Sequence, residues 1–317
     1  MIAALALSAL LGAAPTPQPR PGEPIRREVH ENSLVGEFIV PRDDVRQPAV
    51  IVLGGFECGV PGDGFTFAHQ GYATFSMAYC GAQPLPRAAE EIPVESVSRA
   101  VDWLAANPEV DPARIGIVGI SQGSALALLA AARDPRIKSV AVISPTAYVW
   151  FSPAFDGKAD RSSWAQNGAG LPFVPPDQGS EMNLSRAYDA GGTVALRDLY
   201  DASLAGAKPD LVAKATIPVE RIHAPVLCVA SGDDREWDSA GSCNAIAARR
   251  RTAHADASDR VVVEPRAGHI LALSGRAQGD VIPAGKIKMR MGGDLGANTQ
   301  GQGDALSAVQ TFFAKTL

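Results

Sequence analysis

RIGIVGISQGSALALLAAA, residues 114–132, is the stretch that decides the fold. Its first part, 114–120, is an apolar run typical of a buried strand, and 124–132 is almost wholly apolar, as in a helix buried on all sides. Between them, residues 119–123 read Gly-Ile-Ser-Gln-Gly and fit the pattern G-x-S-x-G. In this context a sharp strand-to-helix turn holds a serine above the sheet edge. We therefore predict that Ser121 is a nucleophile; an ordinary tight turn is the alternative.

Strand-like and helix-like patterns alternate on both sides of this stretch from residue 33 onward. Such alternation predicts the α/β class, with a mostly parallel sheet and helices on both faces. We expect strands at 33–41, 48–55, 73–80, 114–120, 139–145, 224–230 and 260–265, and helices at 92–106, 124–132 and 307–315. Between Thr146 and His223 the alternation stops. A stretch this long without pattern is usually functional, and we predict a lid insertion over residues 146–223.

The expected nucleophile needs a base, because a serine hydroxyl alone is inert. His269 lies in the loop PRAGHI after the last predicted strand, at the same sheet edge as Ser121 and after every candidate acid. This matches the chain order Ser…Asp…His, so we predict His269 as the base. The other histidines lie ahead of the sheet, in a helix-like segment, at the opposite edge or in a polar stretch: His30, His69, His223 and His254.

The acid is expected after the strand between the nucleophile and the base. The run APVLCVA ends in Ser-Gly-Asp-Asp at residues 231–234, at the required edge. The acid must accept the imidazole N–H and fix the tautomer of the base. We predict Asp234 for this role and keep Asp233 as the alternative; the other aspartate would then cap the following turn or helix.

Two backbone amides are candidates for an oxyanion hole. One is the N–H of Gln122, directly after the predicted nucleophile and at the start of a helix. The other is the N–H of Phe56, in the glycine-containing loop after the strand at 48–55, where the backbone can approach a substrate closely. Glu57, the next residue, is either a solvated loop acid or a contact of the site.

The amino-acid composition of the chain limits the kinds of molecule that it can be expected to bind. The chain has 317 residues, 46% hydrophobic and 20% charged, with 29 basic against 34 acidic side chains and a net charge of −5. That balance argues against nucleic-acid binding, which needs a basic face. The only basic run, Arg249 to Arg251, is expected to be a solvated turn of a surface helix. We expect no cofactor, and the oligomeric state is left open.

The four cysteines lack the spacing of metal ligands, and we expect no metal site. Cys228 lies in an apolar strand and is expected to be a core thiol, like other buried free cysteines. Cys58 and Cys80 each follow one of two neighbouring strands, so they pair in an oxidising compartment or remain free thiols.

The N-terminal segment resembles a secretion signal. Residues 1–14 read MIAALALSALLGAA, which is shorter than the roughly 20 apolar residues of a membrane-spanning helix. A proline-rich linker, PTPQPRPGEP, follows at 15–24. We therefore expect a signal peptide and linker over 1–27, a hydrolase domain over 28–317, no stable membrane span in the mature protein, and export to the periplasm or medium. Without a working signal the protein would be cytoplasmic.

Longer phrases of the chain resemble the C-terminal catalytic domain of acyl-CoA thioesterases and bile acid-CoA:amino acid N-acyltransferases. The resemblance runs from about residue 35 to 317 and is carried by PAVIVLGGFECG, GYATFSMAYCGAQPLP, SSWAQNGAGLPFVPP and MGGDLGANTQGQGDALSAVQTFF. It implies an α/β-hydrolase fold and matches Ser121, Asp234 and His269 to nucleophile, acid and base. The thioesterase members use serine where the acyltransferase members use cysteine, so the resemblance implies hydrolysis.

The resulting hypothesis is a serine hydrolase that cleaves an acyl thioester, such as an acyl-CoA, or a carboxylic ester of a small molecule through an acyl-enzyme intermediate. The alternatives are an acyltransferase that passes the acyl group to an amine, and a non-catalytic binding protein on a hydrolase scaffold. Aromatic residues of the lid should shape the acyl pocket, with Trp164 and Phe173 as the candidates for substrate contact.

Overall fold

The computed structural model describes residues 22–41, 45–152, 160–253, 258–285 and 287–317. At its centre is an eight-stranded sheet with the spatial order β1-β2-β4-β3-β6-β7-β11-β12. Its strands are β1 (Ile25–Glu31), β2 (Leu34–Val40), β3 (Gln47–Leu53), β4 (Ala73–Ala78), β6 (Val110–Ile120), β7 (Ile137–Ile143), β11 (Val226–Ser231) and β12 (Arg260–Glu264). Strand β2 runs antiparallel to both of its neighbours, β1 and β4. From β4 to β12 every pairing in the sheet is parallel. The predicted fold class, a mostly parallel sheet between helices, is confirmed.

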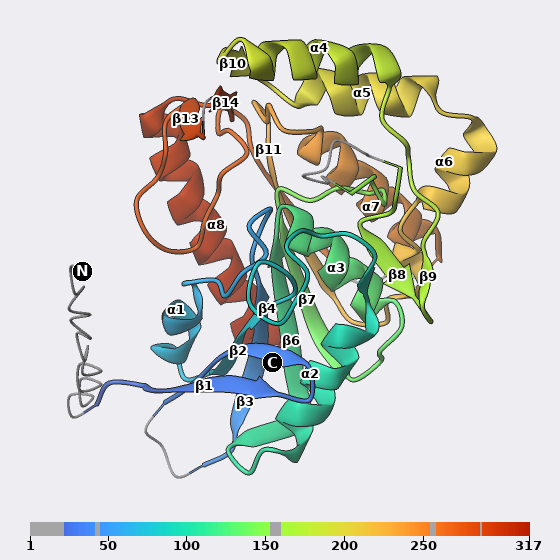
Figure 1. Ribbon diagram of the computed structural model, residues 1–317. Coiled ribbons are helices and arrows are strands. Elements are labelled where there is room, and N and C mark those ends of the chain that lie inside the picture. Colours follow the sequence, from blue (N-terminus) through green and yellow to red (C-terminus); the bar gives the residue numbers. More distant parts are fainter. Residues whose placement is uncertain (1–21, 42–44, 153–159, 254–257, 286) are drawn as a thin grey trace, which may run out of the picture.

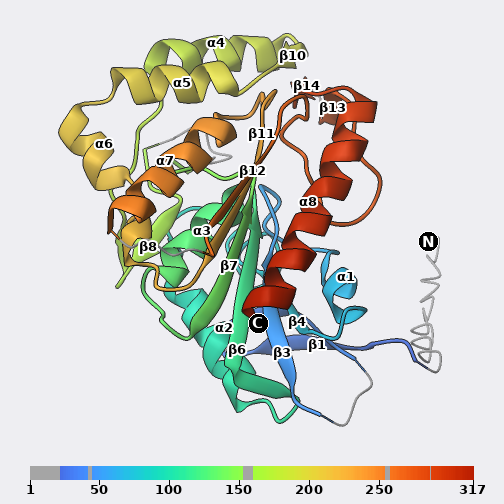
Figure 2. The ribbon, with the colours of Figure 1, turned by 180° about the vertical axis from the view of Figure 1, so that it is seen from behind.

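Helices cover both faces of this sheet (Figures 1 and 2). One face carries α2 (Glu95–Ala106), α3 (Gln122–Ala131) and α7 (Ser239–Ala253), and the other carries α1 (Gly64–Ala68) and α8 (Leu295–Thr316). Strand β3 alternates between the two cores: Ile51 packs on the first face, and Val50 and Val52 pack on the second. A parallel sheet buried on both faces explains why these strands are continuous apolar runs in the sequence.

The segment between β7 and β11 folds into small elements above the carboxyl edge of the sheet (Figure 1). They are β8 (Trp164–Gln166), β9 (Ala169–Gly170), α4 (Gln178–Asp189), β10 (Thr193–Val194), α5 (Arg197–Gly206), α6 (Pro209–Ala215) and the 3-10 helix η1 (Val219–Arg221). We call residues 146–223 the lid, as in the sequence analysis. The lid contains three α-helices, which the sequence did not predict; α4 buries none of its residues fully.

Three further strands tie the lid to the rest of the molecule. Strand β5 (Ile92–Pro93) pairs with β8, while β13 (Val281–Ala284) and β14 (Ile287–Arg290) form a small sheet with β10. The parts of the chain before α2 and after β12 thus hold the lid from two sides. Over the described ranges, no helix combines the length and the apolar content needed to cross a bilayer.

The amino-terminal end differs from the expectation. Strand β1 begins at Ile25, inside the stretch assigned to the linker, and His30 lies within this strand and not ahead of the sheet. The strand reads IRREVHE and is largely exposed at the sheet edge, so it lacks the apolar pattern by which strands are recognised. The expected signal peptide and most of the linker lie outside the described residues, and so does His254.

All four cysteines are paired in two disulfides, Cys58–Cys80 and Cys228–Cys243. The first was one of the two alternatives expected from the sequence. The expectation of a free core thiol at Cys228 is wrong, because α7 packs against β11 and brings the buried Cys243 next to it. The 15-residue spacing of the second pair offers no sequence signal for such a contact.

The basic run on α7 is also only partly what was expected. Arg250 is 1% exposed, not solvated. Its guanidinium forms two bonds with Asp259, at 2.7 and 2.9 Å, and donates to the carbonyl oxygens of Val219, Ile222 and Ala224. This arginine therefore joins the end of the lid to the loop before β12, and its neighbours Arg249 and Arg251 remain partly or fully exposed.

Candidate active site

The serine turn between β6 and α3 is the centre of the site. Ser121 lies between the two elements with φ 53° and ψ −123°. Its flanking glycines have no room for a side chain: a Cβ at Gly119 would lie 2.3 Å from the carbonyl oxygen of Gly123, and a Cβ at Gly123 would lie 2.2 Å from that of Gly54. The two glycines of the motif are thus required by the close packing of the turn against the neighbouring backbone.

Ser121 and His269 are in direct contact. The Ser121 Oγ and the His269 Nε2 are 2.7 Å apart. The imidazole is 4% exposed, and its loop is held by two bonds: the His269 N–H donates to the carbonyl oxygen of Met291, and its carbonyl oxygen accepts from the Ser144 hydroxyl. The ring of Trp237 meets the imidazole edge-on at a centroid distance of 4.9 Å. This packing holds the imidazole with its Nε2 toward the Ser121 hydroxyl.

The other imidazole nitrogen faces Asp234. The His269 Nδ1 lies 2.9 and 3.0 Å from the two carboxylate oxygens of this residue. Asp234 is 2% exposed, and its Oδ1 also accepts the backbone N–H groups of Glu236 and Trp237 at 2.9 and 3.2 Å. The backbone of its own loop therefore fixes the position of the Asp234 carboxylate, independently of the hydrogen bond with the imidazole.

Asp233, the alternative acid, points elsewhere. Its side chain accepts the N–H of Gly293 at 2.9 Å and pairs with Arg235 at 2.6 Å. It binds the loop before α8 instead of capping the turn that follows it. The structure thus brings Ser121, His269 and Asp234 into one hydrogen-bonded line and leaves Asp233 out of it.

A second carboxylate, Glu236, lies beside this line. It is 8% exposed and lines the same pocket as Ser121. Burial, assisted by the charge of Asp234, raises the pKa of Glu236 to about 7, although His269 acts against the shift. Burial alone would lower the pKa of His269, but the charge and hydrogen bond of Asp234 and the charge of Glu236 outweigh it, so the pKa of His269 lies above its ordinary value.

The loop after β3 passes directly over the serine. A Cβ added at Gly55 would lie 3.3 Å from the Cβ and 3.6 Å from the Oγ of Ser121. The carbonyl oxygen of Gly55 accepts the Tyr79 hydroxyl at 2.6 Å and the Cys58 N–H at 2.9 Å. In a trans peptide the C=O and the following N–H point in opposite directions, so these bonds also orient the N–H of Phe56.

Tyr79 and a disulfide anchor this loop. Tyr79 is buried, and burial raises the pKa of its phenol above the ordinary range, which keeps the hydroxyl protonated as a donor. Cys58, three residues after Gly55, is bonded to Cys80, which directly follows Tyr79. The carbonyl oxygen of Cys58 also accepts the N–H groups of both Tyr79 and Cys80. The loop after β3 is thus attached to the end of β4 covalently and by several hydrogen bonds.

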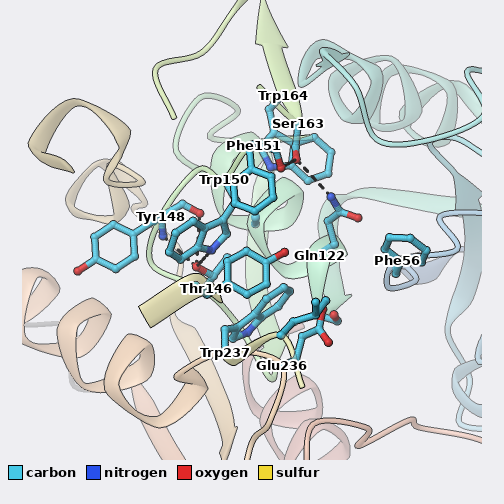
Figure 3. A pocket seen from close by; sticks show the side chains of 14 residues that line it. Phe56, Gln122, Thr146, Tyr148, Trp150, Phe151, Ser163, Trp164, Glu236 and Trp237 are labelled. Atoms are coloured by element: carbon cyan, nitrogen blue, oxygen red, sulfur yellow. Dashed lines mark hydrogen bonds between the residues drawn. The ribbon is translucent and has the colours of Figure 1, made fainter. Parts of the chain in front are cut away.

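The pocket in front of Ser121 has mostly aromatic walls (Figure 3). Figure 3 shows Gln122, Phe56 and Glu236 on one side of it, and Trp150, Phe151 and Trp164 around the other. Of the two lid residues expected to contact substrate, Trp164 lines the pocket. Phe173 lies outside the lining and packs on the central and lid cores, where the next residue, Val174, is held by a bridge to Trp150.

Several lining residues were not predicted. Tyr200 comes from α5 of the lid, and Glu236 and Trp237 come from the loop after β11. Only Glu236 and Trp237 could have been predicted from the sequence, because they follow the predicted acid Asp234 by a few residues. Nothing in the sequence of α5 indicates that Tyr200 lies between Trp150 and Trp237 and meets both rings edge-on, with ring centroids 4.7 and 5.5 Å away.

A serine turn after a buried parallel strand, with an acid and a histidine after later strands, is the arrangement of the α/β-hydrolase fold. The chain is a member of this class. A dienelactone hydrolase-like phosphotriesterase from metagenomic libraries has a similar structure, with a TM-score of 0.54 at 15% identity, over 93% of this chain and 99% of that one.

Sequence comparison identifies the family within the class. Residues 92–317 match the family described as "BAAT / Acyl-CoA thioester hydrolase C terminal", and the chain belongs to it. It is 27% identical over 304 residues to the human acyl-coenzyme A thioesterase 1 and, over an equal length, to the human mitochondrial acyl-coenzyme A thioesterase 2. These matches cover 92% of this chain but 66% and 57% of the relatives, so the chain spans less than two thirds of their length. The family predicted from the sequence is confirmed.

Proposed function

We propose that the protein is a hydrolase of acyl thioesters or carboxylic esters that works through an acyl-enzyme on Ser121. The observation that carries the proposal is the line of bonds from the Ser121 hydroxyl through His269 to Asp234, at 2.7 and 2.9 Å. Family membership supports the substrate class, since the relatives are acyl-coenzyme A thioesterases. The substrate is a small acyl compound, and a coenzyme A thioester is the first to test.

In the first half of the proposed reaction, the Ser121 oxygen attacks the acyl carbon while Nε2 of His269 takes its proton. Asp234 keeps the Nδ1 proton in place and stabilises the imidazolium that forms. The carbonyl oxygen becomes an oxyanion, for which the N–H groups of Gln122 and Phe56 are the proposed donors. Gln122 is the first residue of α3, and its N–H is among those a helix leaves without an intrahelical acceptor.

In the second half, the imidazolium gives its proton to the leaving thiol or alcohol, and the acyl group remains on Ser121. A water molecule, deprotonated by His269, attacks the acyl-enzyme and releases the carboxylic acid. The serine recovers its proton, so the cycle consumes one water and leaves the protein unchanged.

The test is covalent labelling combined with turnover. A fluorophosphonate should label the wild-type protein at Ser121 and should not label Ser121→Ala. The same variant should lose about 10⁴–10⁶ in kcat on p-nitrophenyl esters or acyl-CoAs while keeping its melting temperature. A Ser121→Ala variant that retains a tenth of the activity would refute the assignment. Absence of labelling and turnover in the wild type would favour a binding protein on a hydrolase scaffold.

The same substrates distinguish hydrolysis from acyl transfer. Free acid should be the product even when glycine, taurine or other amines are added in excess. An N-acyl product formed faster than the free acid would show that an amine, not water, is the acceptor.

We also propose that the protein is exported, which the N-terminal apolar segment suggests. Both disulfides support this, because disulfides persist in oxidising compartments and are rare in the cytosol. Mass spectrometry of the native protein should find its N-terminus within or near residues 15–24. An intact Met1 in a cytosolic fraction would contradict export.

A further inference from the structure

The pocket in front of Ser121 contains two hydrogen-bond acceptors to which no described residue donates. One is the amide oxygen of Gln122, which is buried and has no donor within the described structure. The other is the carboxylate of Glu236, to which the described residues offer neither a hydrogen bond nor an ion pair. Buried polar groups are normally paired, so two unused acceptors in one pocket indicate that a ligand supplies the donor.

The orientation of the Gln122 amide follows from its neighbour. The Ser163 hydroxyl donates to the carbonyl oxygen of Phe151 at 3.0 Å. Its oxygen can therefore accept from Gln122, and the amide nitrogen of Gln122 lies 3.3 Å from it. With the nitrogen placed there, the free end of the amide is its oxygen, an acceptor.

The surroundings of Glu236 also fit a positively charged partner. None of the described lining residues of the pocket is a lysine or an arginine. The pocket is lined by the rings of Trp150, Tyr200 and Trp237, and aromatic faces attract cations. Among nearby titratable groups, Asp234 adds negative charge, and His269 opposes it when protonated but is already paired with Asp234.

We propose that Glu236 and the Gln122 amide oxygen bind an ammonium group carried by the substrate, so that the preferred substrates are acyl esters or thioesters with an amino group. The ammonium supplies donors to both acceptors and neutralises the carboxylate, while the aromatic rings enclose its methylene groups. An anionic acyl group would meet Glu236 without a compensating cation and is excluded. This inference rests on the proposed hydrolase function and names its substrate class.

The test uses pairs of p-nitrophenyl esters with equal numbers of heavy atoms. The β-alanine ester is compared with the butanoate, and the 6-aminohexanoate with the heptanoate, after each rate is divided by that of spontaneous hydrolysis. The wild type should prefer the ammonium ester by at least tenfold in kcat/KM at one or both lengths. Glu236→Gln should lower that preference at least tenfold, because the amide keeps the shape but removes the charge.

Glu57→Gln is the matched control, since this carboxylate follows Phe56 in the sequence but is exposed and outside the pocket lining. It should leave the preference within about twofold. A wild-type preference for the methyl-ended ester at both lengths would overturn the inference. An equal loss for both esters in Glu236→Gln would also overturn it, because Glu236 would then only support the charge of His269.

A binding measurement separates this inference from the proposed chemistry. Butylammonium should bind to Ser121→Ala in calorimetry, and at least tenfold more weakly to the double variant Ser121→Ala/Glu236→Gln. Such binding in a protein that hydrolyses no ester would keep the ammonium site and refute the hydrolase. Equal binding to both variants, or none to either, would refute the ammonium site whatever the activity.

Discussion

The hydroxyl of Tyr79 donates a hydrogen bond to the carbonyl oxygen of Gly55 across 2.6 Å. The same carbonyl accepts the Cys58 N–H, so the peptide between Gly55 and Phe56 is held from its oxygen side by two donors. Its N–H end belongs to Phe56, one of the two proposed oxyanion donors. In the proposed reaction Tyr79 is therefore a positioning residue, which acts through this backbone amide and not by contact with the substrate.

Tyr79→Phe should therefore lower kcat by roughly tenfold to a hundredfold, less than the 10²–10³ lost when an oxyanion donor is removed outright. KM should change little, because the amide is needed for the oxyanion and not for the ground state. Tyr72→Phe is the matched control: this tyrosine is also buried, but it packs on α8, on the far face of the sheet. If both variants keep wild-type kcat, or if KM alone rises, Tyr79 has only a packing role.

The two neighbouring aspartates should differ sharply in effect. Asp234→Asn should lose roughly 10³–10⁴ in kcat, because an amide at this place leaves the histidine in the wrong tautomer. Asp233→Asn should lose far less, since that side chain bonds to Gly293 and Arg235. Steady-state kinetics of both variants decide the matter, and the reverse ranking would move the acid to Asp233.

The pH profile should report the charges around the histidine. The base works in its neutral form, so kcat/KM on a neutral ester should rise with pH through the pKa of His269, which lies above its ordinary value of about 6.5. Removing the negative charge of Glu236 makes the imidazolium less favourable and lowers that pKa. Glu236→Gln should therefore move the acid limb to lower pH, and an unmoved or raised midpoint would contradict the coupling.

The pH profile of kcat/KM for the wild-type protein should contain two coupled ionisations on its acid side. The charges of Glu236, whose pKa is about 7, and of His269 interact, and two interacting groups give midpoints that belong to the pair. Glu236→Gln should accordingly also simplify the curve to one ionisation on its acid side.

Trp164 and Phe173 form a natural pair for testing the acyl pocket. Trp164 is 1% exposed and lines the pocket, whereas Phe173 is half-buried outside the lining and packs against the central and lid cores. Both alanine variants should be destabilised, Trp164→Ala by about 3–5 kcal/mol and Phe173→Ala by less, because Phe173 is only partly buried. Only Trp164→Ala should also shift the kcat/KM ratio between long and short acyl chains, by tenfold or more, because each methylene is worth roughly 1–3 kcal/mol. A uniform loss in both variants would assign Trp164 to packing alone.

The sequence predicted the parts of the fold that are buried on both sides. Strands β3 and β11 and the second half of β6, from Ile115, are apolar runs, and α3 buries every residue from Gly123 to Ala131, so these patterns predict buried elements. Strand β1 and helix α4 were missed for the opposite reason. Both are largely exposed, and their positions depend on neighbours far away in the chain.

The residues of the candidate site likewise fall into those that local sequence patterns predict and those whose positions depend on distant parts of the chain. The positions of Ser121 and His269 follow from strand ends and chain order, which are local properties. The burial of Glu236 is not local, because the lid residues Trp150 and Tyr200 close the pocket around it. Phe173 was assigned to the pocket from its aromatic character, which does not tell in which direction a lid residue points.

The backbone at Ser121 has a consequence for the stability of the whole protein. A non-glycine residue with φ 53° and ψ −123° is in a sparsely populated conformation, which costs about 1–3 kcal/mol. Glycine adopts it without that cost, so Ser121→Gly should melt at a higher temperature than Ser121→Ala despite having the smaller side chain. If Ser121 is the nucleophile of the proposed reaction, the protein exchanges conformational stability for reactivity at this residue, and selection for thermostability alone would favour glycine there.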